Sequence, residues 1–320
     1  MEHPLISICI PAYKRIAYLK RLLDSIDKQT FLNYEVIITD DSPDNSISDF
    51  LRQNNYSFIY QYIKNEPAKG TPLNWLEGIK YAKGEWIKII HDDDWLTNGN
   101  SLQLFANAIS DSIDCIFSGY IAYFEKSDKA IDKTISLRRF QRIARHPYFL
   151  FSSNELGPPS VVMFRRSIRE TYDPAFKWLV DIEAYIRIFN HYKCVYINKP
   201  LITMSYNDTQ VTNDCFRNPE IEIREALIYY YKHGPVSCQR ILTYDAWWRL
   251  IRNLNIRSLN KLISLSSGFS LPFFLVSILQ FQKFIPAYFL KYGFISKILM
   301  LLSYYKSKII TGKKSHIFDI

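Results

Sequence analysis

Short apolar runs alternate with helical patterns over the first 96 residues, and this alternation constrains the fold more than any other feature of the chain. Four runs predict strands, at Leu5–Ile10, Tyr34–Thr39, Ser57–Ile63 and Glu85–Ile90. Helical spacing predicts helices between them, at Arg15–Asp27, Ser46–Asn54 and Thr71–Ala82, with Thr71 as N-cap and Pro72 as first helical residue. This order predicts an α/β fold with a mostly parallel sheet and helices on both faces.

Regular elements continue beyond residue 96. Further helices are predicted at Ser101–Ser110 and Asp181–Tyr192, and further strands at Asp114–Tyr123, Ser160–Phe164, Lys193–Ile197 and Leu201–Tyr206. The polar, basic segment Lys126–Arg145 predicts a mobile loop. Strand patterns stop near Pro219 and helical ones take over, so we expect a catalytic α/β domain at 1–218 and a helical region at 219–320.

Basic charge is concentrated in the last quarter of the chain. Twelve Lys or Arg and two Asp follow residue 239, which accounts for the whole net charge of +9. Because Phe, Leu, Ile and Tyr are mixed with these lysines, the composition favours amphipathic helices on an anionic membrane surface over a span through the membrane. Packing against the catalytic domain or in a homodimer is the main alternative, and nucleic acid is disfavoured because the segment is so aliphatic.

The amino terminus and the cysteines both point to a cytoplasmic protein. The first residues lack a basic stretch followed by a long apolar run, so no signal peptide is expected. Five cysteines are scattered without CxxC spacing, which is typical of free thiols in a reducing compartment. Together with the basic tail, this predicts a peripheral location on the inner face of the cell membrane.

Three consecutive carboxylates end the fourth predicted strand, in GEWIKIIHDDDWL (Gly84–Leu96). Asp92, Asp93 and Asp94 repel one another unless a cation or hydrogen-bond donors neutralise them. Mn²⁺ or Mg²⁺ would do so through oxygen ligands, although an acidic turn that caps the next helix explains the triplet equally well. A second pair, Asp40-Asp41, also ends a strand, and such ends converge at one edge of a parallel sheet.

Four motifs occur in a fixed order and spacing: ISICIPAYKR, YEVIITDDSPDNS, NEPAKGTPLNWLEGIKYAKGEWIKIIHDDDWL and WLVDIEAYIRI. Together they resemble glycosyltransferase family 2 over about residues 4–212. The resemblance implies a GT-A, Rossmann-like fold, a nucleotide-sugar donor and inversion at the anomeric carbon.

The resemblance also implies roles for individual residues. The first motif places Pro11, Ala12 and Tyr13 against the nucleotide base, with Arg15 nearby. The remaining residues implied for nucleotide binding are Asp40, Asp41, Lys69, Asn74, Asp92 and Asp93, with a solvent-facing helix position as the alternative for Asn74. Asp94 is implied as the direct metal ligand, and Asp92 as a contact to the ribose or to a metal-bound water. His91 is interpreted as a strand-end residue without a ligand role.

The base of the reaction is expected at Asp181, where the family has a Glu-Asp pair opening a helix; this chain has Val180-Asp181, and Glu183 is the alternative. An N-cap role for Asp181 is the structural alternative. A histidine common in relatives is absent, and Asn207 occupies its place as a weaker metal contact, so diphosphate contacts are expected from a basic loop at Arg138–Arg145. Glu155 is the candidate acceptor contact.

These expectations describe an inverting, metal-dependent glycosyltransferase. It would move a sugar from a nucleotide-diphosphate sugar, most simply a UDP-sugar, to a hydroxyl of a glycan or lipid-linked acceptor in bacterial polysaccharide or oligosaccharide synthesis. A non-catalytic nucleotide-sugar-binding or scaffold protein on the same fold is the alternative. A nucleotidyltransferase would need a Gly-rich basic loop after the first strand, and PAYKRIAY is not one.

Overall fold

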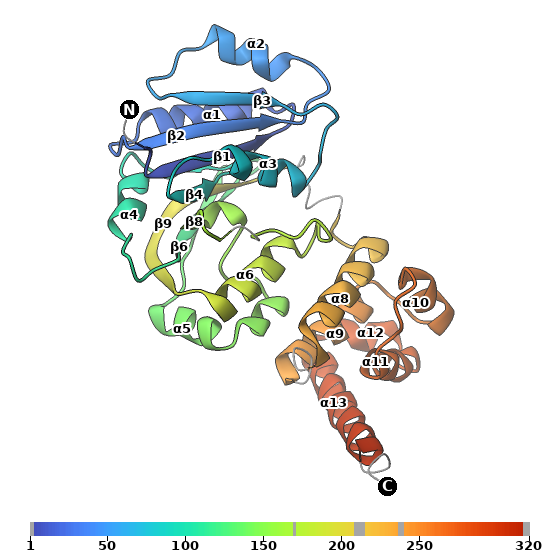
Figure 1. The fold of residues 1–320 in the computed structure, drawn as a ribbon. Coiled ribbons are helices and arrows are strands. Elements are labelled where there is room, and N and C mark those ends of the chain that lie inside the picture. Colours follow the sequence, from blue (N-terminus) through green and yellow to red (C-terminus); the bar gives the residue numbers. More distant parts are fainter. Residues whose placement is uncertain (1–2, 169–170, 208–214, 236–239, 316–320) are drawn as a thin grey trace. The chain divides into compact units, whose positions relative to one another are not determined.

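A computed structural model describes residues 3–168, 171–207, 215–235 and 240–315 (Figure 1). The chain forms two compact units, one of residues 1–147 with 154–210 and one of residues 148–153 with 211–320. The first unit contains the sheet and the second is helical. The predicted boundary at 218–219 remains a prediction, although helix α8 begins at Pro219.

A nine-stranded sheet forms the centre of the first unit, in the order β3-β2-β1-β4-β8-β6-β9-β5 with β7 paired to β6. The strands are β1 Ile6–Ala12, β2 Tyr34–Asp40, β3 Tyr60–Lys64, β4 Trp86–Ile89, β5 Trp95–Leu96, β6 Cys115–Phe124, β7 Lys129–Lys133, β8 Val162–Arg165 and β9 Cys194–Tyr206. Strands β3, β2, β1 and β4 are parallel, and antiparallel pairs enter with β8, β7 and β5. The expected α/β class is confirmed.

The helices of this unit are α1 Ile16–Asp27, α2 Ser46–Gln53, α3 Leu73–Tyr81, α4 Ser101–Asn107, α5 Leu137–Arg145 and α6 Val180–His191, with 3₁₀ turns η1 Pro147–Phe151 and η2 Pro159–Val161. Helix α3 packs on β1 and β2, while α1 contacts β5 and α2. Every residue of β1 is buried, which explains the largely apolar run that predicted it, in which Ser7 is the one polar side chain.

The register of the parallel strands brings their carboxyl ends together. Ala12 pairs with Asp40, and the amide of Ile90 donates to the carbonyl of Cys9 at 3.0 Å. The loops after β1, β2 and β4 therefore start from one edge of the sheet. That edge is where the sequence concentrates its aspartates.

Two local predictions are wrong. The segment 126–145 is strand β7 and helix α5, because Leu137, Phe140 and Ile143 recur at helical spacing among the arginines and bury Phe140 and Ile143. Helix α3 begins at Leu73 with Pro72 at its N-cap, and Thr71 makes no capping bond because it lies one residue too early.

The described residues of the second unit form the helices α8 Pro219–His233, α9 Ile241–Asn253, α10 Leu259–Leu265, α11 Phe273–Lys283, α12 Ala287–Lys291 and α13 Gly293–Ser315. Their core is built around Trp247 and Trp248, with Phe151 of η1 stacked on Tyr229 at 4.4 Å between ring centroids. Among the described residues, no helix combines the length and apolar character needed to cross a membrane.

Candidate active site

Asp40 and Asp41 leave strand β2 in different roles. Asp40 is fully buried and accepts hydrogen bonds from Tyr62 at 2.8 Å, Lys64 at 3.1 Å and the amide of Ser42 at 2.7 Å. Its carboxylate is therefore engaged within the protein. Asp41 continues from the strand end, where its amide donates to the carbonyl of Ala12 at 3.0 Å.

The carboxylate of Asp41 organises the segment before α3. It accepts the side-chain amide of Asn65 at 2.8 Å and the backbone amides of Lys69 at 3.0 Å and Gly70 at 2.7 Å. Asn65 also donates to the side-chain oxygen of Asn74 at 2.9 Å. Asn74 is buried in this network, so the alternative of a solvent-facing Asn74 is wrong.

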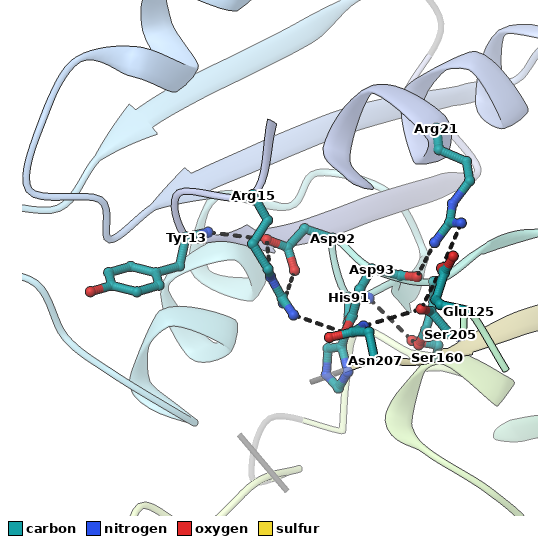
Figure 2. Close-up of polar contacts among 11 residues, drawn as sticks. Tyr13, Arg15, Arg21, His91, Asp92, Asp93, Glu125, Ser160, Ser205 and Asn207 are labelled. Atoms are coloured by element: carbon teal, nitrogen blue, oxygen red, sulfur yellow. Dashed lines mark hydrogen bonds and ion pairs between the residues drawn. The ribbon is translucent and has the colours of Figure 1, made fainter. Parts of the chain in front are cut away.

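Two of the predicted nucleotide contacts remain accessible. Tyr13 is 48% exposed just beyond the fully buried Pro11 and Ala12 of β1, and it projects away from the carboxylates in Figure 2. The ammonium of Lys69 forms an ion pair with Glu77 at 2.7 Å. An exposed tyrosine next to a strand end can stack on a planar base without burial of its hydroxyl.

Arg15 connects the first and fourth strand ends (Figure 2). Its guanidinium forms ion pairs with Asp92 and with Asp93, the latter at 2.8 Å, while the amide of Tyr13 donates to Asp92 at 3.2 Å. The side chains of Asp92 and Asp93 are almost completely buried. Arg15 therefore supplies the positive charge that these two carboxylates require.

Asp94 is held by two serines, Ser160 of the turn η2 and Ser205 of strand β9. Ser160 donates its hydroxyl to one carboxylate oxygen at 2.5 Å, and the amide of Ser205 donates to the other at 3.3 Å. Asn207, at the end of β9, donates to Asp93 at 3.2 Å. Asn207 thus lies beside the acidic cluster, but it presents its amide nitrogen to the carboxylate.

Burial makes negative charge at this cluster unfavourable. It raises the pKa of Asp92 to about 7, against the opposing effect of Arg15, and it raises the pKa of Asp94 well above its usual range. Burial also lowers the pKa of His91 to about 4, so its imidazole is neutral. Lys88, buried behind the cluster with its ammonium over the ring of Phe105, has its pKa lowered well below the usual value by burial.

These residues fit a divalent cation. A ring nitrogen of His91 and carboxylate oxygens of Asp93 and Asp94 lie within 4.8 Å of one another, the one such group of three among the described residues. The Nε2 atom of His91 is buried and has no hydrogen-bond partner in the described part of the chain, and the ring packs on Trp75 at 4.7 Å between centroids. His91, given no ligand role from the sequence, therefore lies with the candidate metal ligands.

Asp181 lies on a separate element, in the first turn of α6. Its carboxylate accepts the side-chain amide of Asn154 at 2.7 Å and the amide of Ile182 at 2.7 Å. Asn154 is itself fixed, because its side-chain oxygen accepts the amides of Leu156 and Gly157, both at 3.1 Å. Glu183, the alternative base, is fully buried and paired with Arg187 at 2.7 Å.

Glu155, the predicted acceptor contact, is paired with an arginine of the segment predicted to bind the diphosphate. Glu155 forms an ion pair with Arg139, and one of its bonds, from the Nε atom of Arg139, is 2.6 Å long. Arg139 belongs to helix α5, so the basic loop expected at Arg138–Arg145 does not exist as a loop.

Sequence reasoning missed several residues that hold the candidate carboxylates, among them Asn65, Asn154 and Ser160. Asn65 and Asn154 lie in connections between elements, where small polar residues are ordinary, and Ser160 lies in the turn η2. Asn65 is the first residue of the third motif, which was a signal for it, whereas Asn154 and Ser160 lie outside all four motifs.

The first unit has the features of a GT-A class domain. Its carboxylates lie at the strand ends of a mixed sheet, and another carboxylate lies in the first turn of a later helix. Solved structures agree at the level of the fold. S. aureus TarS residues 1–349 in complex with UDP-GlcNAc superposes with a TM-score of 0.56 at 14% identity, covering 87% of this chain and 90% of that one. The mannosyltransferase PcManGT from Pyrobaculum calidifontis, in complex with GDP-Man and Mn²⁺, gives 0.52 at 13% identity, covering 97% and 87%.

Among the sequence relatives of the chain are proteins named as glycosyltransferases. The chain is 29% identical over 190 residues to EpsH of Bacillus subtilis (strain 168), a match over 57% of this chain and 53% of that protein. It is 32% identical over 117 residues to the abequosyltransferase RfbV of Salmonella typhimurium (strain LT2), over 35% of each chain. The chain thus spans about half the length of the first relative and about a third of the second.

The family model described as Glycosyl transferase family 2 matches residues 7–172, just over half of the 320 residues. The chain therefore belongs to glycosyltransferase family 2. The match includes all the strand-end carboxylates and Asn154, and it ends before Asp181.

Proposed function

We propose that this protein is an inverting glycosyltransferase that moves a sugar from a nucleotide-diphosphate sugar to a hydroxyl group of a glycan or lipid-linked acceptor. The observation that carries the proposal is the separation of two carboxylate sites. A buried cluster follows β4, and a single hydrogen-bonded carboxylate opens α6. Inversion needs one site for the leaving diphosphate and another for the proton of the attacking hydroxyl.

The donor would lie across the ends of β1, β2 and β4. Tyr13 would stack on the base, and the segment held by Asp41 would line the nucleotide pocket, with Asp92 directed at the ribose. We propose a UDP-sugar as the donor to test first, since one structural neighbour was solved with UDP-GlcNAc. Another neighbour was solved with GDP-Man, so both support the wider class of nucleotide-diphosphate sugars. Asp40, whose oxygens are engaged by Tyr62 and Lys64, would support this pocket from behind.

The divalent cation of the proposed site, Mn²⁺ or Mg²⁺, would offset the charge that grows on the leaving diphosphate. Asp94, Asp93 and His91 would hold it, and Asn207 would orient Asp93. Arg15 bonds to Asp92 and Asp93 in the present structure. In the donor complex it would remain near the phosphates, as a fixed positive charge at the strand ends.

Asp181 would act as the base. Its carboxylate accepts hydrogen bonds from Asn154 and Ile182, and such bonds favour the ionised form that takes a proton. Glu183 is less suited because its charge is already paired with Arg187. Glu155 and Arg139 would lie on the acceptor side, where the ion pair could open to a sugar hydroxyl.

The acceptor proposed is a bacterial surface glycan under assembly, at the cytoplasmic face of the cell membrane. RfbV, named as an abequosyltransferase, is one relative that supports a sugar-transfer role. A lipid-linked acceptor requires the enzyme to work at a membrane, and the basic helical unit supports that location. Nucleic acid is not proposed as a partner, and a homodimer is the competing explanation of the helical unit.

The decisive experiment measures donor hydrolysis and sugar transfer with UDP-sugars in the presence of Mn²⁺ or Mg²⁺. Asp94→Ala should lose metal-dependent turnover, and Asp181→Asn should keep UDP binding while transfer falls by about 10³-fold. Asp49→Asn is the matched control, since its carboxylate is exposed on α2. Full transfer by Asp181→Asn would rule out the proposed base.

The non-catalytic alternative has a distinct outcome. A nucleotide-sugar-binding or scaffold protein would bind UDP-sugars tightly and give neither hydrolysis nor transfer with any acceptor. Membership of the family and the hydrogen-bonded Asp181 both favour the enzyme.

A further inference from the structure

Helix α13 buries several serines and exposes a row of large apolar side chains. Its buried residues include three serines, Ser296, Ser303 and Ser307, together with Met300 and Tyr304. The serines bond inward: Ser296 accepts the indole N–H of Trp248 at 3.0 Å, and Ser303 bonds the hydroxyl of Tyr244 at 2.7 Å. A surface helix of a water-soluble protein normally buries its apolar face and exposes its polar face.

The exposed face of α13 is apolar. An apolar stripe of large side chains lies in solvent, with Phe294 at 80% and Leu302 at 55% exposure; its members are Phe294, Ile295, Ile298, Leu302 and Tyr305. At about 100° per residue these five fall within an arc of about 100°, opposite the buried serines. An aligned stripe of this kind costs free energy in water unless something covers it.

Lysines border the stripe on both sides. By the same helical geometry, Lys306 falls about 20° beyond one edge of the arc, and Lys297 and Lys308 fall about 40–60° beyond the other. All three side chains are exposed. Their alkyl stems can lie along an apolar layer while their ammonium groups reach anionic headgroups.

The rest of the unit extends this surface. The end of α11 and the whole of α12 add exposed rings at Phe284, Tyr288, Phe289 and Tyr292, next to Lys283 and Lys291. Helix α12 contacts α13, and Figure 1 shows α13 extending past the other helices of its unit. Tyrosine and phenylalanine beside lysine are typical of the membrane–water interface.

No acidic residue occurs from Ala246 to Phe318, a stretch that contains eleven Lys or Arg. A second copy of this chain would bring the same positive surface against itself, and like charges across an interface cost several kcal/mol. An anionic lipid surface is complementary to the stripe and to its border at once.

We propose that the apolar stripe of α13, with the aromatic residues of α12, is a membrane-docking surface that inserts into the headgroup region of an anionic bilayer. The helix lies along the membrane plane, with Lys297, Lys306 and Lys308 on the lipid phosphates. This binding does not depend on sugar transfer. The further idea that membrane binding brings the enzyme to a lipid-linked acceptor rests on the proposed function.

The test is co-sedimentation of the full chain with vesicles of phosphatidylcholine alone or with roughly 30% phosphatidylglycerol, without nucleotide sugar. The chain should bind the anionic vesicles and lose affinity as salt is raised. Replacing Phe294, Ile298 and Leu302 by serine together should weaken binding at least about tenfold. Replacing Lys297 and Lys306 by glutamine should weaken it about fivefold for each lysine, with most loss at low salt.

The control replaces Leu32 and Ile59 by serine, because both are more exposed than 70% in the catalytic unit and lie outside the stripe. This variant should bind vesicles as the unaltered chain does. Since the serine variants of α13 change only exposed positions, their circular-dichroism melts should match that of the unaltered chain.

Three results would overturn the inference. The unaltered chain could fail to sediment with anionic vesicles, or the triple serine variant could bind as well as the unaltered chain. In the third, sedimentation velocity shows that the unaltered chain is an oligomer and that the triple serine variant is a monomer, while neither protein binds vesicles. That result would assign the stripe to contact with a second copy of the chain. Hydrolysis of the nucleotide sugar in solution should be unchanged in every variant, so failure of this inference and failure of the proposed function are distinguishable.

Discussion

Replacing Arg15 by glutamine should destabilise the protein more at pH 8 than at pH 6. Arg15 is the cation that bonds Asp92, a side chain that is 1% exposed. With Arg15 present, burial still raises the pKa of Asp92 from 3.8 to about 7. Without Arg15 the carboxyl group should hold its proton through this whole pH range, because its other donor among the described residues, the backbone amide of Tyr13, carries no net charge.

The sign and size of this pH-dependent loss of stability follow from proton linkage. A folded protein that holds a proton which the unfolded chain releases loses stability as pH rises. Between pH 6 and 8 the unaltered protein holds on average about half a proton on Asp92, and the variant about one. A difference of half a proton over two pH units, at about 1.36 kcal/mol per proton and pH unit, makes the stability deficit of the variant grow by about 1.4 kcal/mol.

Urea unfolding of both proteins in chelator-containing buffer at pH 6, 7 and 8 measures this growth. Arg52→Gln, which removes an exposed partner of Asp49, should show no such trend. A difference between Arg15→Gln and the unaltered protein that stays constant or shrinks as pH rises would refute the reasoning. It would mean that Asp92 is ionised at pH 6 and finds another donor.

Three further predictions concern other parts of the catalytic unit. His91→Gln should weaken Mn²⁺ binding about tenfold in calorimetry and Mg²⁺ binding less, because imidazole is a better ligand for transition metals. Asn154→Ala should lower kcat about tenfold with little change in KM and shift the acidic limb of the pH profile upward, because it removes a donor to Asp181. Gly84→Ala should lower the free energy of unfolding by about 1–3 kcal/mol, since the new Cβ would lie 2.6 Å from the backbone nitrogen of Ser7.

The catalytic sheet was predictable because its signals are local. The fully buried β1 has a largely apolar sequence with a single polar residue, Ser7, and α1 buries residues at helical spacing, including Leu19, Leu22 and Ile26. Helix α5 was missed because four arginines among nine residues mask a short apolar pattern, and only its burial of Phe140 and Ile143 reveals it.

The candidate site likewise has a part that the sequence predicts and a part that it does not. Its carboxylates stand in motifs, so their clustering follows from the order of the strands. Their partners come from far along the chain: Ser160 bonds Asp94 across 66 residues, and Asn154 bonds Asp181 across 27. Composition and periodicity contain no information on such pairings, and the proximity of the His91 ring to Asp93 depends on a rotamer that no sequence pattern fixes.

The short turn η1 makes part of the folding wait for residues that are synthesised much later. Residues 148–153 precede α6 and β9 in the chain, yet they belong to the helical unit, where Phe151 stacks on Tyr229 and packs against Trp247. During synthesis the ring of Phe151 lacks these two contacts until α8 and α9 leave the ribosome. A polypeptide that stops after residue 210 would keep Phe151 and lose both rings, so the catalytic unit cannot be isolated by a single truncation without leaving an aromatic surface open to aggregation.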